Sequence, residues 1–218
     1  MIRSLILSGT GEYADPWHPF GATSERIAAI LTGLGHEVRI SDRVADRVAD
    51  LDQWDLVVVN AAAGPQADRA AARAARAGLA TALDRGVGLL AIHVGATTLL
   101  RLPEWEPVTG AAWVNGHSMH PKVGPCRILT YPDRHPVCAT VADFDIVDER
   151  YTHLRTAPDI VPLAAHVHEG VRYPLLWCRE RARSRVVADT LGHDERSYDS
   201  AAHRELITRA ARWLTGEI

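Results

Sequence analysis

The chain has 218 residues, of which 47% are hydrophobic and 23% charged, and its formal net charge at pH 7 is −3. This length and composition suffice to bury one substantial core, and we expect a single domain over residues 1–218. The balance is slightly acidic, with one lysine, Lys122, among 24 basic residues, so a basic surface for nucleic acid is excluded. No apolar run approaches the length of a membrane span and no charged leader precedes the first apolar run, so we expect a cytoplasmic protein without membrane contact.

Cysteine usage and glycine motifs exclude further classes. Cys126, Cys138 and Cys178 are widely separated and odd in number, which fits neither a disulfide framework nor a zinc site built on paired cysteines. We expect all three to be small buried apolar residues. Neither a GxGxxG motif nor a GxxxxGK(S/T) motif follows a predicted strand, so no nucleotide cofactor is predicted.

The first part of the chain alternates predicted strands with predicted helices. Short apolar runs bounded by turn residues indicate the strands, and apolar or alanine-rich segments with helical spacing indicate the helices. We predict strands over residues 2–7, 37–40, 56–59 and 87–92, and helices over residues 24–34 and 66–84. This alternation implies right-handed crossovers and a parallel sheet.

After about Arg101 the pattern changes to strands with few helices between them. Residues 103–121 are irregular and rich in tryptophan, histidine and glycine, and the acidic segment 143–151 carries no strand prediction. We predict strands over residues 123–130, 160–168, 173–178 and 185–189, and a closing amphipathic helix over residues 201–214. The expected fold class is therefore α/β, with a mainly parallel sheet and an antiparallel extension.

His93 stands at a glycine-flanked turn directly after the predicted strand 87–92. In open parallel sheets the site lies at the carboxyl ends of the strands, and a sharp turn there pushes one side chain into the crevice. An imidazole at this tip can ligate a metal or transfer a proton, but it is a poor replacement for a thiol nucleophile. No Cys, Ser or Thr occupies the tip, so a Cys-His or Ser-His mechanism lacks its first member.

Two histidine-bearing loops are further candidates for that crevice. His18 follows Trp17 in the loop after the first strand, where the alternative is a turn in which the tryptophan covers the core. His117 and His120 are three residues apart, a spacing that presents two rings to one metal ion when the chain is helical or tightly turned. His93, His117 and His120 form the predicted metal-ligand set, and zinc is the predicted metal. The alternative is an exposed loop with hydrogen-bonded histidines.

An acidic segment and a second strand end supply the remaining candidates. Asp148 and Glu149 can act as general acid and base if their environments separate their pKa values, although acidic segments are more often only solvated. Adjacent residues in an extended chain point to opposite faces, so at most one of them enters a site. His193 follows the predicted strand 185–189 and is either a catalytic base or a structural hydrogen-bond donor.

Several motifs occur in a specific order over nearly the whole chain. They are Leu7-Ser8-Gly9, Trp17-His18, Gly86 to His93 with Ala96-Thr97, Pro103-Glu104-Trp105, His135-Pro136, Phe144 to Tyr151, Tyr173 to Trp177, Arg185-Val186-Val187, Leu191-Gly192-His193-Asp194 and Trp213. In this order they resemble the ThuA-like, or trehalose-utilisation, family of the class I glutamine amidotransferase-like superfamily. The resemblance implies a flavodoxin-like three-layer sandwich, a lost amidotransferase cysteine and a role in sugar metabolism.

The resemblance also implies which residues face the crevice. They are His93, His117, Glu149 and His193, with Trp17, His18, Trp105 and Trp177 as candidate sugar-facing groups. Tryptophan faces pack against sugar rings, but tryptophan is equally a core residue. Both interpretations stay open for Trp17 and Trp105, and the core is favoured for Trp177 and Trp213.

We predict an enzyme that acts on a carbohydrate or keto-sugar, as an isomerase or lyase. His93, His193 and Glu149 are its predicted catalytic residues, and the predicted substrate-binding residues are Trp17, His18, Trp105 and His117. A divalent metal would polarise a sugar carbonyl, and zinc suits imidazole ligands best. The alternatives are a noncatalytic sugar-binding or regulatory module and, less favoured, a cysteine amidase. A homodimer is expected only because it is the commonest oligomer.

Overall fold

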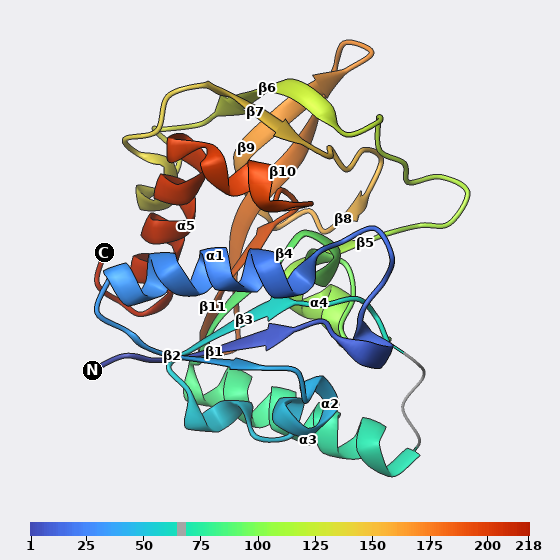
Figure 1. Cartoon of the computed structure of the whole chain (residues 1–218), viewed down its shortest axis with the longest axis vertical. Helices are drawn as coiled ribbons and strands as arrows, with labels where there is room; N and C mark the ends of the chain where they lie inside the picture. The colour runs from blue at the N-terminus through green and yellow to red at the C-terminus, as the bar shows by residue number, and fades with distance from the viewer. Residues whose placement is uncertain (65–68) are drawn as a thin grey trace.

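A mixed β-sheet forms the centre of the computed structural model, which describes residues 1–64 and 69–218. Within these residues the sheet has nine strands in the order β2-β1-β3-β4-β11-β10-β9-β6-β7 (Figure 1). The parallel part comprises β1 (Arg3–Ser8), β2 (Glu37–Ser41), β3 (Leu56–Asn60), β4 (Gly88–Ile92) and β11 (Ser184–Asp189). The antiparallel extension comprises β10 (Val171–Arg181), β9 (Val161–His168), β6 (Gly124–Thr130) and β7 (Phe144–Asp148).

The direction of β7 matters for the site. Each step from β11 through β10, β9 and β6 to β7 is antiparallel, so four reversals return β7 to the direction of β4 and β11. The carboxyl ends of these three strands therefore lie at the same edge of the sheet. The residues that follow them, among them Glu149, His93 and His193, are brought to this edge by the topology.

Helices cover both faces of the sheet and complete three layers (Figure 1). The helices α1 (Phe20–Gly33) and α5 (Ala201–Leu214) pack on one face, where they meet alternate strand residues such as Ile6, Val58 and Leu90. The other face is covered by α2 (Val44–Val48), α3 (Arg69–Arg85) and α4 (Trp105–Thr109). Strands between two such helical layers need apolar side chains on both faces, that is, at consecutive and not only at alternate positions. The predicted three-layer α/β sandwich is confirmed.

Most predicted elements are found with shifted ends. The helix predicted from residue 24 begins at Phe20, and the one predicted over residues 66–84 is α3 from Arg69, with residues 66–68 outside the described residues. The short helices α2 and α4 and the paired strands β5 (Ala111–Ala112) and β8 (Arg155–Thr156) were not predicted.

The acidic segment without a strand prediction contains β7, which corrects that interpretation. Phe144 and Ile146 are buried while Asp145 is exposed. This is the alternation of a half-buried strand, with the Asp145 side chain on the solvated face and the last residue, Asp148, buried.

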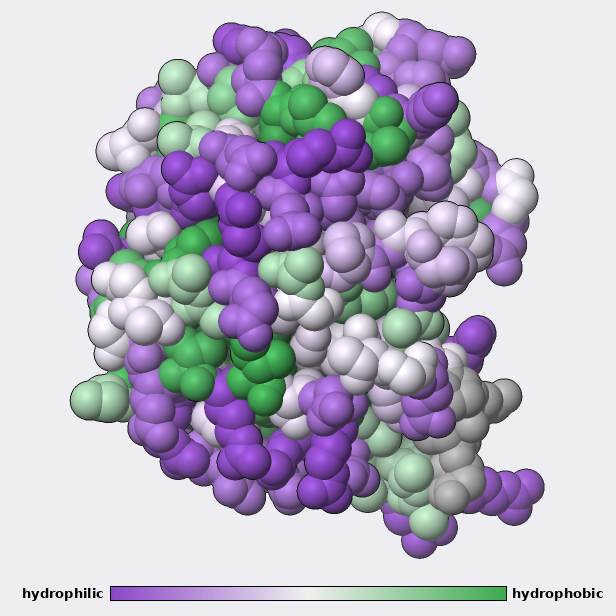
Figure 2. Space-filling view, in the orientation of Figure 1, coloured by the Kyte–Doolittle hydropathy of each residue, from purple (hydrophilic) through white to green (hydrophobic). Residues whose placement is uncertain are grey.

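No helix in residues 1–64 and 69–218 combines the length and apolar character needed to cross a bilayer. On the face shown in Figure 2, hydrophilic side chains separate several small apolar clusters.

Candidate functional site

His93 occupies a sharp turn at the end of the central strand β4. The chain passes at Ile92 directly into the short 3-10 helix η3 (His93–Ala96), and His93 adopts φ +50°. This left-handed conformation is uncommon outside glycine, and such strain often marks functional sites. Gly95 lets the turn lie against β3, because a Cβ there would stand 2.4 Å from the backbone oxygen of Val59. The turn holds the His93 ring, which is only 1% exposed, beneath the surface.

The ring of His93 contacts polar partners on both of its nitrogens. Nδ1 lies 2.7 Å from the backbone oxygen of Thr190, and Nε2 lies 3.1 Å from Nε2 of His18 and 3.4 Å from Oε2 of Glu149. A carbonyl oxygen can only accept, so Nδ1 carries the hydrogen and donates it to Thr190. The other nitrogen, Nε2, is thereby directed at His18 and Glu149.

His18 is oriented by a carboxylate in its own loop. Asp15 accepts hydrogen bonds from the backbone N–H groups of Trp17 and His18, both at 2.9 Å, and from Nδ1 of the His18 ring at 2.7 Å. This tight Asx turn explains why the loop after β1 places the ring where it does. With Nδ1 bound to Asp15, Nε2 of His18 faces His93.

Asp148 and Glu149 point to opposite sides of the chain and make different contacts, as expected for neighbours in an extended segment. Asp148 accepts the backbone N–H groups of Glu149 at 2.7 Å, Gly192 at 2.9 Å and His193 at 3.1 Å. This buried carboxylate joins the end of β7 to the loop after β11. Glu149 points the other way, with Oε2 3.7 Å from Nδ1 of His193 and Oε1 3.0 Å from Nδ1 of His120.

The four side chains His18, His93, Glu149 and His193 form one compact cluster. One donor atom from each lies within 4.8 Å of the others, so the cluster could hold a metal ion. Burial opposes protonation of His93, but Glu149, Asp148 and the Thr190 carbonyl outweigh it and raise its pKa. Burial and the neighbouring His93 lower the pKa of His18. Burial of Glu149 is outweighed by the histidines around it, which lower its pKa and keep it ionised.

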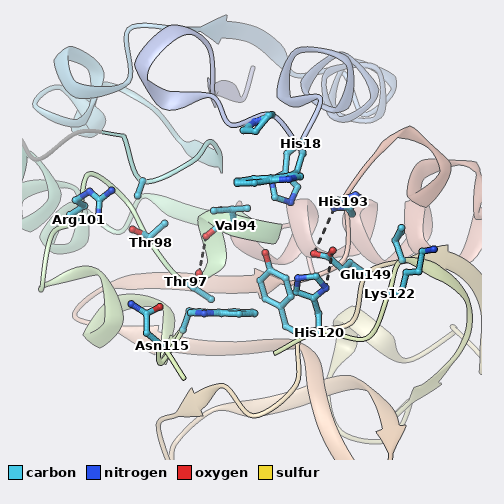
Figure 3. A pocket seen from close by; sticks show the side chains of 16 residues that line it. His18, Val94, Thr97, Thr98, Arg101, Asn115, His120, Lys122, Glu149 and His193 are labelled. Atoms are coloured by element: carbon cyan, nitrogen blue, oxygen red, sulfur yellow. Dashed lines mark hydrogen bonds and ion pairs between the residues drawn. The ribbon is translucent and has the colours of Figure 1, made fainter. Parts of the chain in front are cut away.

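A cavity of about 990 Å³ lies above this cluster. Figure 3 shows His18, Glu149, His193 and His120 at one end of it, and Arg101, Thr98 and Asn115 at the other. Trp17, Trp113 and Tyr151 add aromatic surface to its wall. The cavity thus combines a polar, titratable floor with aromatic walls, the composition typical of small-molecule sites.

Comparison with known proteins agrees with this architecture. The family model ThuA, described as trehalose utilisation, matches residues 3–214. The chain belongs to the ThuA family. No curated protein matches it.

Solved structures similar to this ThuA-family chain support the same fold. A ThuA-like protein from Parabacteroides merdae has a TM-score of 0.81 at 16% identity, over 99% of this chain and 90% of that one. A ThuA-like protein from Bacteroides uniformis has a TM-score of 0.76 at 15% identity, over 98% and 91%. A glutamine amidotransferase from Thermotoga maritima has a TM-score of 0.58 at 10% identity, over 98% of both chains. At these identities the likeness establishes the fold alone.

The structure places the predicted site residues unequally. Trp17, His18, His120, Glu149 and His193 line the cavity, and His93 lies beneath them.

Trp105 does not line the cavity, contrary to its predicted role in substrate binding. It is 1% exposed and its Nε1 donates to the backbone oxygen of Gly95 at 2.8 Å, beneath the η3 turn. It supports the turn that carries His93 from below and has no surface to offer a ligand.

The predicted metal set His93, His117 and His120 is not assembled. His117 is exposed, outside the cavity lining, with its ring 5.3 Å from that of His153. His117 ends the turn over residues 115–117, whereas His120 follows the extended bridge between Met119 and Thr152, so no helix or single tight turn contains both histidines. In such a backbone, residues three apart do not share a face, so the spacing does not bring both rings to one ion.

Sequence reasoning missed Trp113, Arg101 and Lys122 as cavity residues and did not assign a role to Tyr151. Tyr151 is the last residue of the acidic motif Phe144 to Tyr151, so its place in that motif was a usable signal. Trp113 and Arg101 lie in or next to the irregular stretch 103–121, where no periodicity shows which side chains face inward.

Thiol chemistry finds no support in this cavity. None of the described residues that line it is a cysteine. Burial raises the pKa of Cys126 to about 11 and that of Cys178 to about 12, and it raises the pKa of Cys138 as well. A reactive cysteine needs the opposite shift.

His166 supports the segment that carries Tyr151 and predicts a pH dependence of stability. Its Nε2 lies 3.3 Å from the backbone oxygen of Tyr151, and burial lowers its pKa to about 4. In the unfolded chain a histidine titrates near pH 6.5, so the unfolded state binds the extra proton first. This contribution to stability is complete above about pH 6.5 and is lost as the pH falls toward 4.

We expect His166→Asn, which keeps a donor but cannot titrate, to flatten the decline in stability by about 2 kcal/mol between pH 7 and pH 4.5. Urea unfolding of both proteins at the two pH values measures this difference. Equal declines would show that His166 is not the group responsible.

Proposed function

We propose that this ThuA-family protein is an enzyme that acts on a sugar or keto-sugar at the cluster of His93, Glu149 and His193, either by acid–base catalysis from these side chains or by catalysis at a divalent metal such as zinc that they bind. One observation carries the proposal: a buried carboxylate, Glu149, contacts three imidazoles at the floor of an aromatic-walled cavity. The family's description as trehalose utilisation supports a carbohydrate as the substrate class.

The arrangement suits removal and return of a proton next to a sugar carbonyl. His193 and His120 border the cavity and approach Glu149 from two sides, at 3.7 and 3.0 Å. Imidazoles are the side chains most often used in general acid–base catalysis, and a carboxylate behind an imidazole fixes its orientation. A metal bound in the cluster would add polarisation of the carbonyl oxygen.

The cavity wall suits a sugar ring. Trp17, which is 72% exposed, and the partly buried Trp113 both present indole surface to the cavity. The apolar face of a pyranose packs against such rings, while Asn115, Thr98 and Arg101 provide hydrogen-bonding groups at the far end.

The test is a panel of trehalose, glucose and their 3-keto derivatives, followed for product by NMR and for binding by calorimetry. We expect turnover of at least one of them, and a loss of about 100-fold or more in Glu149→Gln, the usual share of a general acid–base group. Asp143→Asn, at the other end of β7, is the matched control and is expected to retain activity. Binding without turnover would favour a noncatalytic sugar-binding module, and the absence of both would contradict the proposal.

A further inference from the structure

Two imidazole nitrogens in the cluster face each other without a hydrogen between them when both rings are neutral. His93 donates from Nδ1 to Thr190, and His18 donates from Nδ1 to Asp15. A neutral imidazole has only one N–H, so both Nε2 atoms present lone pairs across 3.1 Å. Such a contact is stable only with a cation between the two atoms, either a proton or a metal ion.

The distances favour a metal ion over a single proton. Two donors bound at 2.0–2.1 Å to a tetrahedral ion lie about 3.3 Å apart. The observed separations are 3.1 Å between the two Nε2 atoms and 3.4 Å from His93 Nε2 to Glu149 Oε2. A shared proton lies on the line between one pair of atoms, whereas one ion accounts for both of these short contacts together. The four donor atoms lie within 4.8 Å of one another, so the cluster must contract around the ion to bring all of them to bonding distance.

His193 provides an independent indication of a ligand. Its Nδ1 is buried and has no hydrogen-bond partner among the described residues, and it lies 3.7 Å from Oε2 of Glu149. A buried polar atom without a partner is costly, and in the tautomer in which Nδ1 is an acceptor, a cation that the side chains themselves do not supply would satisfy it.

The charges around the cluster point the same way. Asp148 and Glu149 are 1% and 7% exposed, and within residues 1–64 and 69–218 neither forms an ion pair with an arginine or lysine. Buried carboxylates require pairing or metal coordination. A divalent cation would balance both charges at one point.

We propose that Nε2 of His18, Nε2 of His93, Oε2 of Glu149 and Nδ1 of His193 bind one divalent transition-metal ion. This inference rests on the proposed function and names the cofactor site of the same cavity. Asp15, the Thr190 carbonyl and Asp148 fix the donors, as outer partners do for metal-bound histidines and carboxylates. Three of the four ligands line the cavity, so a substrate oxygen can reach the ion.

This set differs from the one predicted from sequence. It shares only His93 with that set. His120 contacts the other oxygen of Glu149, Oε1, and stays outside the ligand cluster.

The experiment uses the full chain, stripped with a chelator and titrated with zinc against a competing indicator. We expect one zinc ion per chain, bound about 100-fold more weakly or worse by His18→Ala and by His93→Ala, since even the loss of an outer partner costs 10- to 100-fold. His117→Ala, an exposed histidine outside the cavity, is the matched control and should bind zinc like the parent protein.

A second measurement needs no variant and decides the matter if His93→Ala fails to fold. Cadmium NMR of the histidine-labelled protein should show scalar coupling to nitrogens of His18, His93 and His193 and none to His117 or His120. Absence of stoichiometric binding, or coupling to His117 or His120 instead, would overturn the assignment. Zinc binding without any sugar binding contradicts the proposed function alone, whereas sugar turnover by protein that binds no metal contradicts this inference alone.

Discussion

Asp148→Ala is expected to lower the free energy of unfolding by about 3 kcal/mol or more and to weaken zinc binding 10- to 100-fold. The carboxylate is 1% exposed and accepts the backbone N–H groups of Glu149, Gly192 and His193. Its removal leaves these buried donors without partners, at about 1–3 kcal/mol each. The same bonds hold β7 against the loop after β11, so Glu149 and His193 lose their mutual position. Urea unfolding and zinc titration measure the two effects.

A variant at the opposite end of β7 separates loss of stability from loss of the site. Asp143 accepts the backbone N–H of Thr130 at 2.8 Å and lies on the exposed side. We expect Asp143→Ala to cost about 1 kcal/mol, the usual worth of one hydrogen bond, and to leave zinc affinity unchanged. An Asp148→Ala protein that binds zinc as tightly as the parent would show that this carboxylate does not position the ligands.

The fold was predictable from local pattern because its central strands are buried on both faces. Residues 56–59 and 87–92 are apolar on both parities, and such runs identify parallel strands without knowledge of their partners. The strand β7 was missed for a physical reason. Its solvated face carries Asp145, and its last residue, Asp148, is an acid on the buried face. Only Phe144 and Ile146 therefore show the alternation of apolar residues that marks a half-buried strand, and the acidic composition conceals it.

The site was only partly predictable because its members come from distant segments. His93, Glu149 and His193 each follow a strand, and the rule that sites lie at carboxyl strand ends is enough to make them candidates. The contact of His18 with His93 depends on how one loop folds over the sheet edge, and no spacing in the sequence records it. The spacing of His117 and His120 misled because ligand-spacing rules assume a helical or tightly turned backbone, which this segment lacks.

The tryptophans show the same limit, because an indole is suited both to a core and to a sugar site. The sequence did not decide whether Trp105 is a core residue or faces a sugar, and the structure buries it beneath η3. The sequence pattern favoured the core for Trp177, and there the structure agrees, at 0% exposed. Trp113, which received no role, forms part of the cavity wall.

Trp177→Ala is therefore expected to cost about 3–5 kcal/mol of stability, the range for truncating a buried aromatic side chain. The indole lies in the central strand β10, and its Nε1 donates to the backbone oxygen of Thr109 at 2.7 Å, which is left unpaired in the variant. A loss of this size is a large share of the roughly 5–15 kcal/mol that holds a domain folded.

Trp113→Ala should show the opposite pattern. Its ring is partly exposed and packs edge-on against Tyr151 at 5.1 Å, so we expect a stability loss of about 1 kcal/mol. Removal of the cavity wall should weaken binding of the sugar identified by the panel about fivefold, because a stacked aromatic ring contributes about 1 kcal/mol. Urea unfolding and calorimetry on both variants measure the contrast. Equal stability losses would mean that Trp113 is a core residue like Trp177. Unchanged sugar affinity in Trp113→Ala would mean that the aromatic wall has no part in recognition and that the ligand is held by the polar floor alone.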